Sequence, residues 1–317
     1  MKGDIEKGVE GTAAPTHGIS QAAGVDLDLV AAAEPDARSQ WSRFFGRFLR
    51  HRMAVISVFV LVALFVLCFG ATVIAPYGKN QQDLLLGPVG PSAKHWFGTD
   101  ELGRDQLTEI LFAGQISLRI GLAVAMLATL VGTVVGAMAG FFGRVYEQLV
   151  MRVTDLFLVV PAIAILAIAI KKFGNDSLTI VLVLASLGWM QIARIVRGQV
   201  LSIKEKEFVD AARGSGASSI RIVARHILPN VIGPILVNAT LGIAGAIVAE
   251  STLSFLGFGV QPPITSWGRM LSDARGTVGT DKAHLIYFPG LALLATILAV
   301  NFIGDGLRDA FDPQSRR

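Results

Sequence analysis

The apolar and polar positions of this chain alternate in long blocks rather than in short amphipathic repeats. A helix needs about 20 mostly apolar residues to cross the hydrocarbon core of a bilayer, and six stretches approach or exceed that length. They are Met53–Ala75, Ile120–Phe142, Val153–Ile170, Ser177–Ala193, Val231–Ala249 and Leu285–Gly304. The pattern therefore predicts an all-α polytopic membrane protein with six transmembrane helices, of which the fourth is the shortest.

Basic residues gather in alternate segments between these stretches, and this asymmetry predicts the orientation. The segments richer in Lys and Arg are the one before the first stretch and those after the second, fourth and sixth stretches. They contain Arg43, Arg47, Arg50, Arg52, Arg144, Arg152, Lys204, Lys206, Arg213, Arg221, Arg225, Arg308, Arg316 and Arg317. Because Lys and Arg mark the cytoplasmic side, both termini are predicted to be cytoplasmic in a multi-pass plasma (inner) membrane protein. The net charge of +4 reflects this topology and does not indicate a nucleic-acid partner.

The chain before the first apolar stretch divides into two parts. Residues 1–40 lack apolar periodicity and are predicted to form a disordered cytoplasmic tail. Residues 41–52 carry arginines along one helical face and aromatic or aliphatic side chains on the rest. This pattern is typical of a helix that lies on membrane lipid in the interface, although a cytoplasmic extension of the first transmembrane helix fits it too. Residues 53–313 then form the six-helix membrane domain.

Small residues and prolines give the apolar stretches internal structure. Gly132, Gly136 and Gly140 recur every fourth residue, so they share one helix face. Three bare positions in register let a second helix approach closely, and we expect a tight helix interface there. Pro161 and Pro234 lie inside the third and fifth stretches, where each predicts a kink or, for Pro234, an early helix position.

A polar segment, residues 202–229, separates two of the most apolar stretches. Its backbone and charges need water or a protein partner. Lys204–Arg213 predicts a short helix that Gly214 and Gly216 end, and Ser218 is placed to cap a second helix over residues 219–227. Pro229 is expected to end that helix and can open the fifth apolar stretch. Phe208, Ala211 and Ala212 are expected on one side of the first helix. This arrangement indicates a helical knob that docks on another protein.

The same segment resembles the coupling loop in membrane subunits of ATP-binding-cassette importers. The family pattern is Glu-Ala-Ala, three residues, Gly, nine residues, Ile, any residue and Leu-Pro. The matching residues here are Asp210, Ala211, Ala212, Gly216, Leu228 and Pro229, with Glu207 and Phe208 just before them. Asp replaces the family's Glu, which keeps the charge, and His226 stands at the Ile position.

Three further segments narrow this resemblance. Residues 95–121, 253–271 and 288–313 resemble parts of the dipeptide, oligopeptide and nickel permeases, and together with the loop they point to the C-type member of those paired permeases. The resemblance implies a second, homologous permease subunit, two ATP-binding subunits and an extracytoplasmic solute-binding protein as partners. It also implies that this chain is not an enzyme, since the partner subunits hydrolyse ATP.

The chemistry available within the chain agrees with this division of labour. The sequence has no Gly-x-x-x-x-Gly-Lys-Ser/Thr phosphate loop, so no cofactor is expected in this subunit. It also has no His, Cys and Asp cluster with metal-ligand spacing, so no metal site is expected.

Three polar residues in the apolar stretches are candidates for the translocation path. Asp155 either lines the path or pairs with Arg152 at the start of its helix. Asn238 either lines the path or bonds across to another helix. Glu250 lies near the outer end of the fifth stretch, where an acidic group is a functional candidate.

The residues leave an alternative function and the solute open. An ion-coupled secondary transporter would also be apolar and helical, but it would need charged groups near the middle of its helices. The family resemblance allows dipeptides, longer peptides, nickel complexes and glutathione as solutes.

Overall fold

The computed structural model describes residues 40–311. The predicted tail therefore lies outside the described residues, apart from its last position. Residues from Phe44 onward belong to one compact unit. Within the described part the chain is helical and forms no β-strand, which confirms the all-α class.

Five helices of this unit are long and apolar enough to cross a membrane. They are α3 (Arg52–Phe69), α5 (Gln106–Phe142), α8 (Ser177–Ile203), α11 (Leu228–Phe255) and α13 (His284–Phe311). A sixth crossing is formed if α6 (Arg144–Val159) and α7 (Ala162–Phe173) are taken together. The number of predicted transmembrane helices therefore agrees with the structure when this pair counts as one.

The third apolar stretch is not the continuous helix that its length predicts. The axes of α6 and α7 meet at 91°. The break lies at Val160, which has an extended backbone (φ −81°, ψ 138°), and at Pro161. Proline disfavours the helical conformation in the residue before it and cannot donate a backbone hydrogen bond. The fourth stretch, predicted to be the shortest, is instead a helix of 27 residues.

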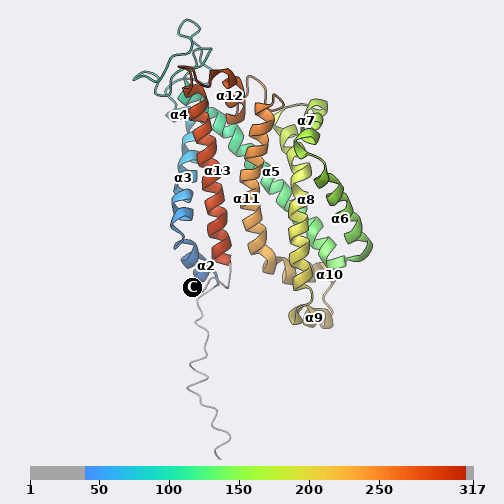
Figure 1. Ribbon diagram of the computed structural model, residues 1–317. Coiled ribbons are helices and arrows are strands. Elements are labelled where there is room, and N and C mark those ends of the chain that lie inside the picture. The colour runs from blue at the N-terminus through green and yellow to red at the C-terminus, as the bar shows by residue number, and fades with distance from the viewer. Residues whose placement is uncertain (1–39, 312–317) are drawn as a thin grey trace, which may run out of the picture. The chain divides into compact units, whose positions relative to one another are not determined.

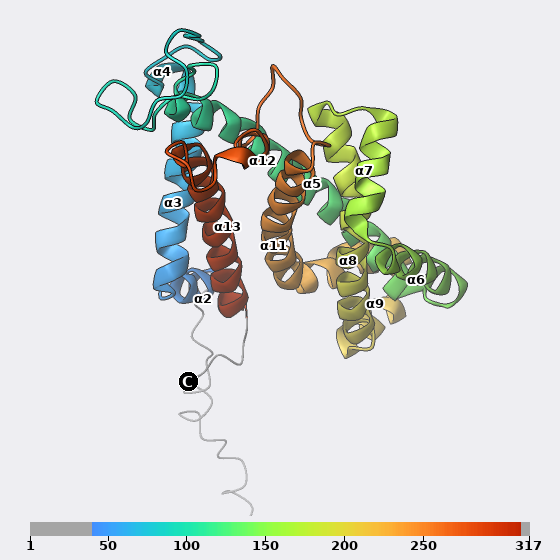
Figure 2. The same ribbon diagram turned by 45° about the horizontal axis from the view of Figure 1, so that its top comes forward.

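The short elements gather at the two ends of the helix bundle (Figure 1). One end, called the α9 end below, carries α9 (Glu207–Gly214) and α10 (Ser219–Ile222). The opposite end, called the α12 end, carries α4 (Ala71–Ile74), the long connection that follows it, and α12 (Trp267–Asp273). Figure 2 shows that α5 crosses the bundle obliquely between these ends.

Helix α2 (Gln40–Phe48) precedes α3 in the chain. The ring of Phe44 lies 4.6 Å from the ring of Phe311 at the end of α13, measured between centroids. The position of helix α2 in the membrane interface stays a prediction.

Gly132, Gly136 and Gly140 of α5 lie against α8. A methyl group added at Gly132 would come within 2.7 Å of the Ile192 side chain, and one added at Gly140 would come within 2.8 Å of Val200. At Gly136 the backbone of Ala193 occupies the space that a side chain would need. The backbones of the two helices therefore pack closely against each other over two helical turns, with backbone atoms of α8 in the way of a side chain at Gly136.

This packing predicts a difference between two glycines of the pair. Gly136→Leu should destabilise the fold by about 1–3 kcal/mol or more, because backbone atoms of α8 cannot move aside as a side chain can. Gly198→Leu is the matched control, since a side chain there meets nothing within 4 Å. Thermal unfolding in detergent should show a lowered midpoint for the first variant only. Equal midpoints would contradict the packing.

Candidate functional site

The predicted coupling loop projects from the α9 end, between α8 and α11 (Figure 1). Its first helix is shorter than expected: α9 begins at Glu207, after a turn at Lys204–Lys206. Helix α8 continues to Ile203, immediately before this turn, because Val196 and Val200 keep its buried face apolar. The helix predicted from Lys204 is thus wrong in its start and right in its end region.

Gly216 closes α9 with a complete Schellman motif. Its N–H donates to Arg213 O at 2.9 Å, and the Ala217 N–H donates to Ala212 O at 3.1 Å. Gly216 has φ +77°, which places it in the left-handed region. A side chain there would meet nothing within 4 Å, so the requirement for glycine is conformational and not steric.

The loop is anchored by apolar side chains beneath it. Val209, Ile222 and Ile227 are buried and share one cluster with residues of α8 and α11. Ala212 packs partly against this cluster, whereas the neighbouring Phe208 is 43% exposed and Ala211 is exposed. Consequently α9 is a knob with a fixed inner face and an outer face that offers an aromatic ring and a small residue.

Asp210 also lies on the outer face. Its Oδ1 accepts a hydrogen bond from Arg213 Nη1 at 2.8 Å, and its side chain is 65% exposed. Exposed pairs of this kind are worth little to stability. The carboxylate is therefore accessible to a partner protein.

The second part of the loop is continuous with α11, contrary to the expectation that Pro229 ends a separate helix. Pro229 does lie in the first turn of α11, as expected for a residue that opens the fifth apolar stretch. After α10 the chain makes a π turn, Val223–Ile227, and Leu228 N–H donates to Val223 O, five residues earlier. The side chain of Asn230 donates to His226 O at 2.7 Å. A π turn shifts the hydrogen-bond register, so the missing N–H of Pro229 is accommodated. Ser218 precedes α10 without a side-chain capping bond.

Of the path candidates, Asn238 lines a cavity of about 640 Å³. Walls from α5, α8, α11 and the break between α6 and α7 enclose it, and Val160 and Pro161 lie in its lining. Gln191 and Asn238 are its polar side chains amid mostly apolar ones. The Asn238 amide donates to Pro234 O in its own helix at 2.8 Å and not to another helix. The cavity borders the break at which α7 turns away from α6.

Asp155 lies elsewhere, in a second hollow that runs along α6. Its partner is Arg194 of α8, at 2.6 Å, and not the predicted Arg152. In the same hollow Glu147 of α6 pairs with Arg197 of α8. The two ion pairs join α6 to α8 at positions far apart in sequence.

Glu250 faces away from the cavity and is fully buried. One carboxylate oxygen, Oε1, accepts hydrogen bonds from the hydroxyl groups of Ser254 and Ser266 at 2.7 and 2.8 Å. It therefore does not line either hollow, and its environment links α11 to α12.

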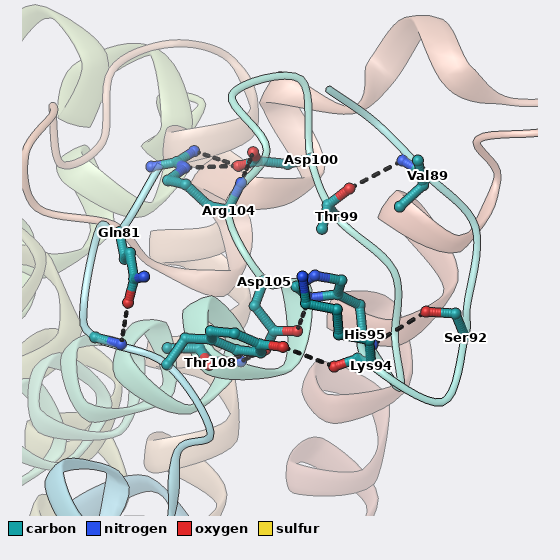
Figure 3. Close-up of polar contacts among 12 residues, drawn as sticks. Gln81, Val89, Ser92, Lys94, His95, Thr99, Asp100, Arg104, Asp105 and Thr108 are labelled. Atoms are coloured by element: carbon teal, nitrogen blue, oxygen red, sulfur yellow. Dashed lines mark hydrogen bonds and ion pairs between the residues drawn. The ribbon is translucent and has the colours of Figure 1, made fainter. Parts of the chain in front are cut away.

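The long connection before α5 is ordered by polar contacts that sequence reasoning missed (Figure 3). Asp105 caps α5 by accepting from Thr108 N at 2.9 Å, and its other oxygen lies 2.9 Å from His95 Nδ1. The Tyr77 hydroxyl donates to Lys94 O at 2.9 Å. An Asp three residues before Thr at the start of an apolar run was the signal for the cap.

Comparison with known proteins places the chain in a family. Residues 132–317 match the family described as binding-protein-dependent transport system inner membrane component, and residues 39–88 match the N-terminal transmembrane domain of oligopeptide transport permease C. The chain therefore belongs to the family of inner membrane components of binding-protein-dependent transport systems. It is a multi-pass permease subunit of an ATP-binding-cassette importer.

Individual relatives match most of the chain. The oligopeptide transport system permease protein OppC of Mycobacterium tuberculosis is 42% identical over 85% of this chain and 93% of its own length. The dipeptide transport system permease protein DppC of Bacillus subtilis is 39% identical, over 86% and 85%. The glutathione transport system permease protein GsiD of Escherichia coli is 37% identical, over 91% and 95%. These matches confirm the resemblance and support the importer over an ion-coupled secondary transporter.

The Schellman turn generates a prediction with a matched control. Gly216→Val should reduce import about tenfold or more, because a left-handed residue with a side chain costs about 1–2 kcal/mol and a β-branched one more. Gly214→Val should import normally, since Gly214 ends α9 without a positive φ and has open space around it. Uptake is normalised to the amount of protein in the membrane. Similar uptake by the two variants would contradict a conformational role for Gly216.

Proposed function

We propose that this chain forms one half of the translocation path of a peptide importer and transmits force from ATPase subunits. In this proposal it pairs with a second, homologous permease, two ATP-binding subunits contact the coupling loops, and an extracytoplasmic binding protein delivers the solute. The observation that carries the proposal is the knob formed by α9, with its inner face anchored on α8 and α11 and its outer face exposed.

The knob suits a docking role because its two faces differ. Phe208, Asp210 and Ala211 offer a ring, a charge and a small surface to a groove on another protein. Val209 lies beneath them at 0% exposure, so a push on α9 acts on the packed helices and not on a loose connection. Glu207 and Ala212 flank this face, and Leu228 and Pro229 carry the chain into α11. ATP is bound by the partner subunits, and this chain needs no cofactor.

Solute would pass along the cavity beside Asn238. Its apolar lining and two amide side chains suit a solute with peptide bonds, since amides hydrogen-bond to peptide groups whatever the charge of the side chains. Asp155 would lie on the approach to this cavity from the α9 end. The names of the relatives cover oligopeptides, dipeptides and glutathione, and we propose peptides as the solute class. Mass spectrometry of the ligand released from the partner binding protein identifies the solute.

The α9 end would face the cytoplasm and the α12 end the outside, with both termini cytoplasmic. The basic residues of the loops at the α9 end support this orientation. The charge-rich connection before α5 would then face the binding protein.

A labelling experiment tests the orientation. Cysteine at Lys94, in the connection near the α12 end, should react with an impermeant thiol reagent added outside intact cells. Cysteine at Lys206 should react only after the membrane is opened. The native Cys68 is 1% exposed and should stay unlabelled. If only the cysteine at position 206 reacted in intact cells, the result would contradict the proposed orientation and indicate the opposite one.

Co-purification tests the partners. A tagged wild-type chain should retain a second permease and ATPase subunits. Asp210→Lys should release the ATPases but keep the second permease, because a reversed charge within an interface costs several kcal/mol. Asp281→Lys, an equal charge reversal on an exposed residue near the α12 end, is the control. If both variants retained the ATPases, Asp210 would not be part of the docking surface.

A further inference from the structure

Glu250 is a fully buried acidic residue five positions before the end of α11. Its Oε1 accepts hydrogen bonds from Ser254 Oγ at 2.7 Å and from Ser266 Oγ at 2.8 Å, and Ser251 Oγ lies 3.4 Å from Oε2. Among the described residues it makes no ion pair. A carboxylate in such a place is costly unless hydroxyl groups satisfy it, so these serines account for its burial.

The serines come from two elements, and Glu250 joins them. Ser251 and Ser254 belong to α11 itself, whereas Ser266 is the N-cap of α12 and also accepts from Arg269 N–H at 3.2 Å. One carboxylate oxygen thus receives a hydroxyl from each helix. Without Glu250, the weak contact between the Ser254 and Ser266 hydroxyls, 3.4 Å apart, would be the remaining link between these two serines.

The neighbouring Trp267 fixes the other side of the same turn. Its side chain is fully buried, its N–H donates to Ser117 Oγ of α5 at 3.2 Å, and its indole Nε1 donates to Ile110 O at 3.0 Å. Gly268 lies directly on the backbone of Ser251, where a side chain would not fit. The start of α12 is therefore clamped between α5, through Trp267, and α11, through Glu250.

The helix that carries Glu250 reaches the coupling loop. Residues 219–255 form one continuous helical segment made of α10, the π turn and α11. Ile222 and Ile227 anchor the loop at one end of this helix, and Glu250 bonds to α12 at the other. A displacement of the loop along or about this axis therefore reaches the carboxylate without crossing a break in the helix.

We propose that Glu250 is a positioning residue that couples the position of α12 to the position of α11. Through this one helix, events at the ATPase subunits and events at the outer surface affect each other. The proposal rests on the proposed function, in which α12 lies on the side of the binding protein. Glu250 acts here as an acceptor that joins two helices and not as a group that contacts the solute. The ATPase activity stimulated by the loaded binding protein should depend on it, and the unstimulated activity should not.

The first test compares two variants in the complete reconstituted complex. Glu250→Ala removes both acceptor oxygens and should reduce the stimulation by loaded binding protein about tenfold, the effect of losing hydrogen bonds to a buried charged group. Glu250→Gln keeps one carbonyl oxygen as an acceptor and should retain a large part of the stimulation. Full stimulation of the alanine variant would overturn the proposal. If the wild-type complex itself is not stimulated, the proposed function fails instead.

The second test asks whether a covalent link can replace the carboxylate. Ser254→Cys and Ser266→Cys are introduced with Glu250→Ala and Cys68→Ala, because the two serine oxygens lie 3.4 Å apart. Oxidation should form a disulfide between α11 and α12 and restore the stimulation, and reduction should abolish it again. A merely destabilised protein or a proton-carrying role for Glu250 would not respond in this way. The proposed link between α11 and α12 would be contradicted if the disulfide formed without restoring the stimulation. It would also be contradicted if no disulfide formed even with Glu250 present.

Discussion

Helical continuity from Ser219 to Phe255 is the constraint on which the functional parts of this structure depend. Pro229 would ordinarily break a helix at this point, because it lacks an N–H and its ring crowds the preceding turn. The π turn at Val223–Ile227 shifts the register and preserves the helix. The knob at one end and the serine-bound carboxylate at the other are thereby joined by one continuous helical segment, which also contains Pro234.

The rest of the bundle divides into a tightly packed and a loosely packed region around this helix. Gly132, Gly136 and Gly140 bring the backbones of α5 and α8 into close contact, so these two helices form the tightly packed region. By contrast, α7 leaves α6 at 91° and borders the cavity that contains Asn238. A transporter needs both kinds of packing, since a rigid frame transmits displacement and a bistable region opens a passage.

Local features of this architecture could be predicted from sequence. The lengths of the apolar stretches follow from bilayer thickness, and the left-handed Gly216 follows from the end of a short helix pattern. Pro161 indicated a kink, but its angle depends on packing that no local pattern encodes. The pairing of Asp155 with Arg194 spans 39 residues, and the serine shell of Glu250 requires α12 to fold back onto α11. Periodicity shows which face of a helix a residue occupies but not which helix lies against that face. For this reason it indicated Arg152 as the ion-pair partner of Asp155 and placed Glu250 among the candidates for the translocation path.

The energy source for transport tests the central conclusion most directly. The purified complex of this chain with its partner subunits, reconstituted in vesicles with loaded binding protein, should take up peptide when ATP is supplied to the α9 side. Uptake should continue when proton and sodium gradients are abolished with ionophores. Uptake driven by an imposed ion gradient without ATP would contradict the conclusion that this chain is the permease subunit of an ATP-driven importer.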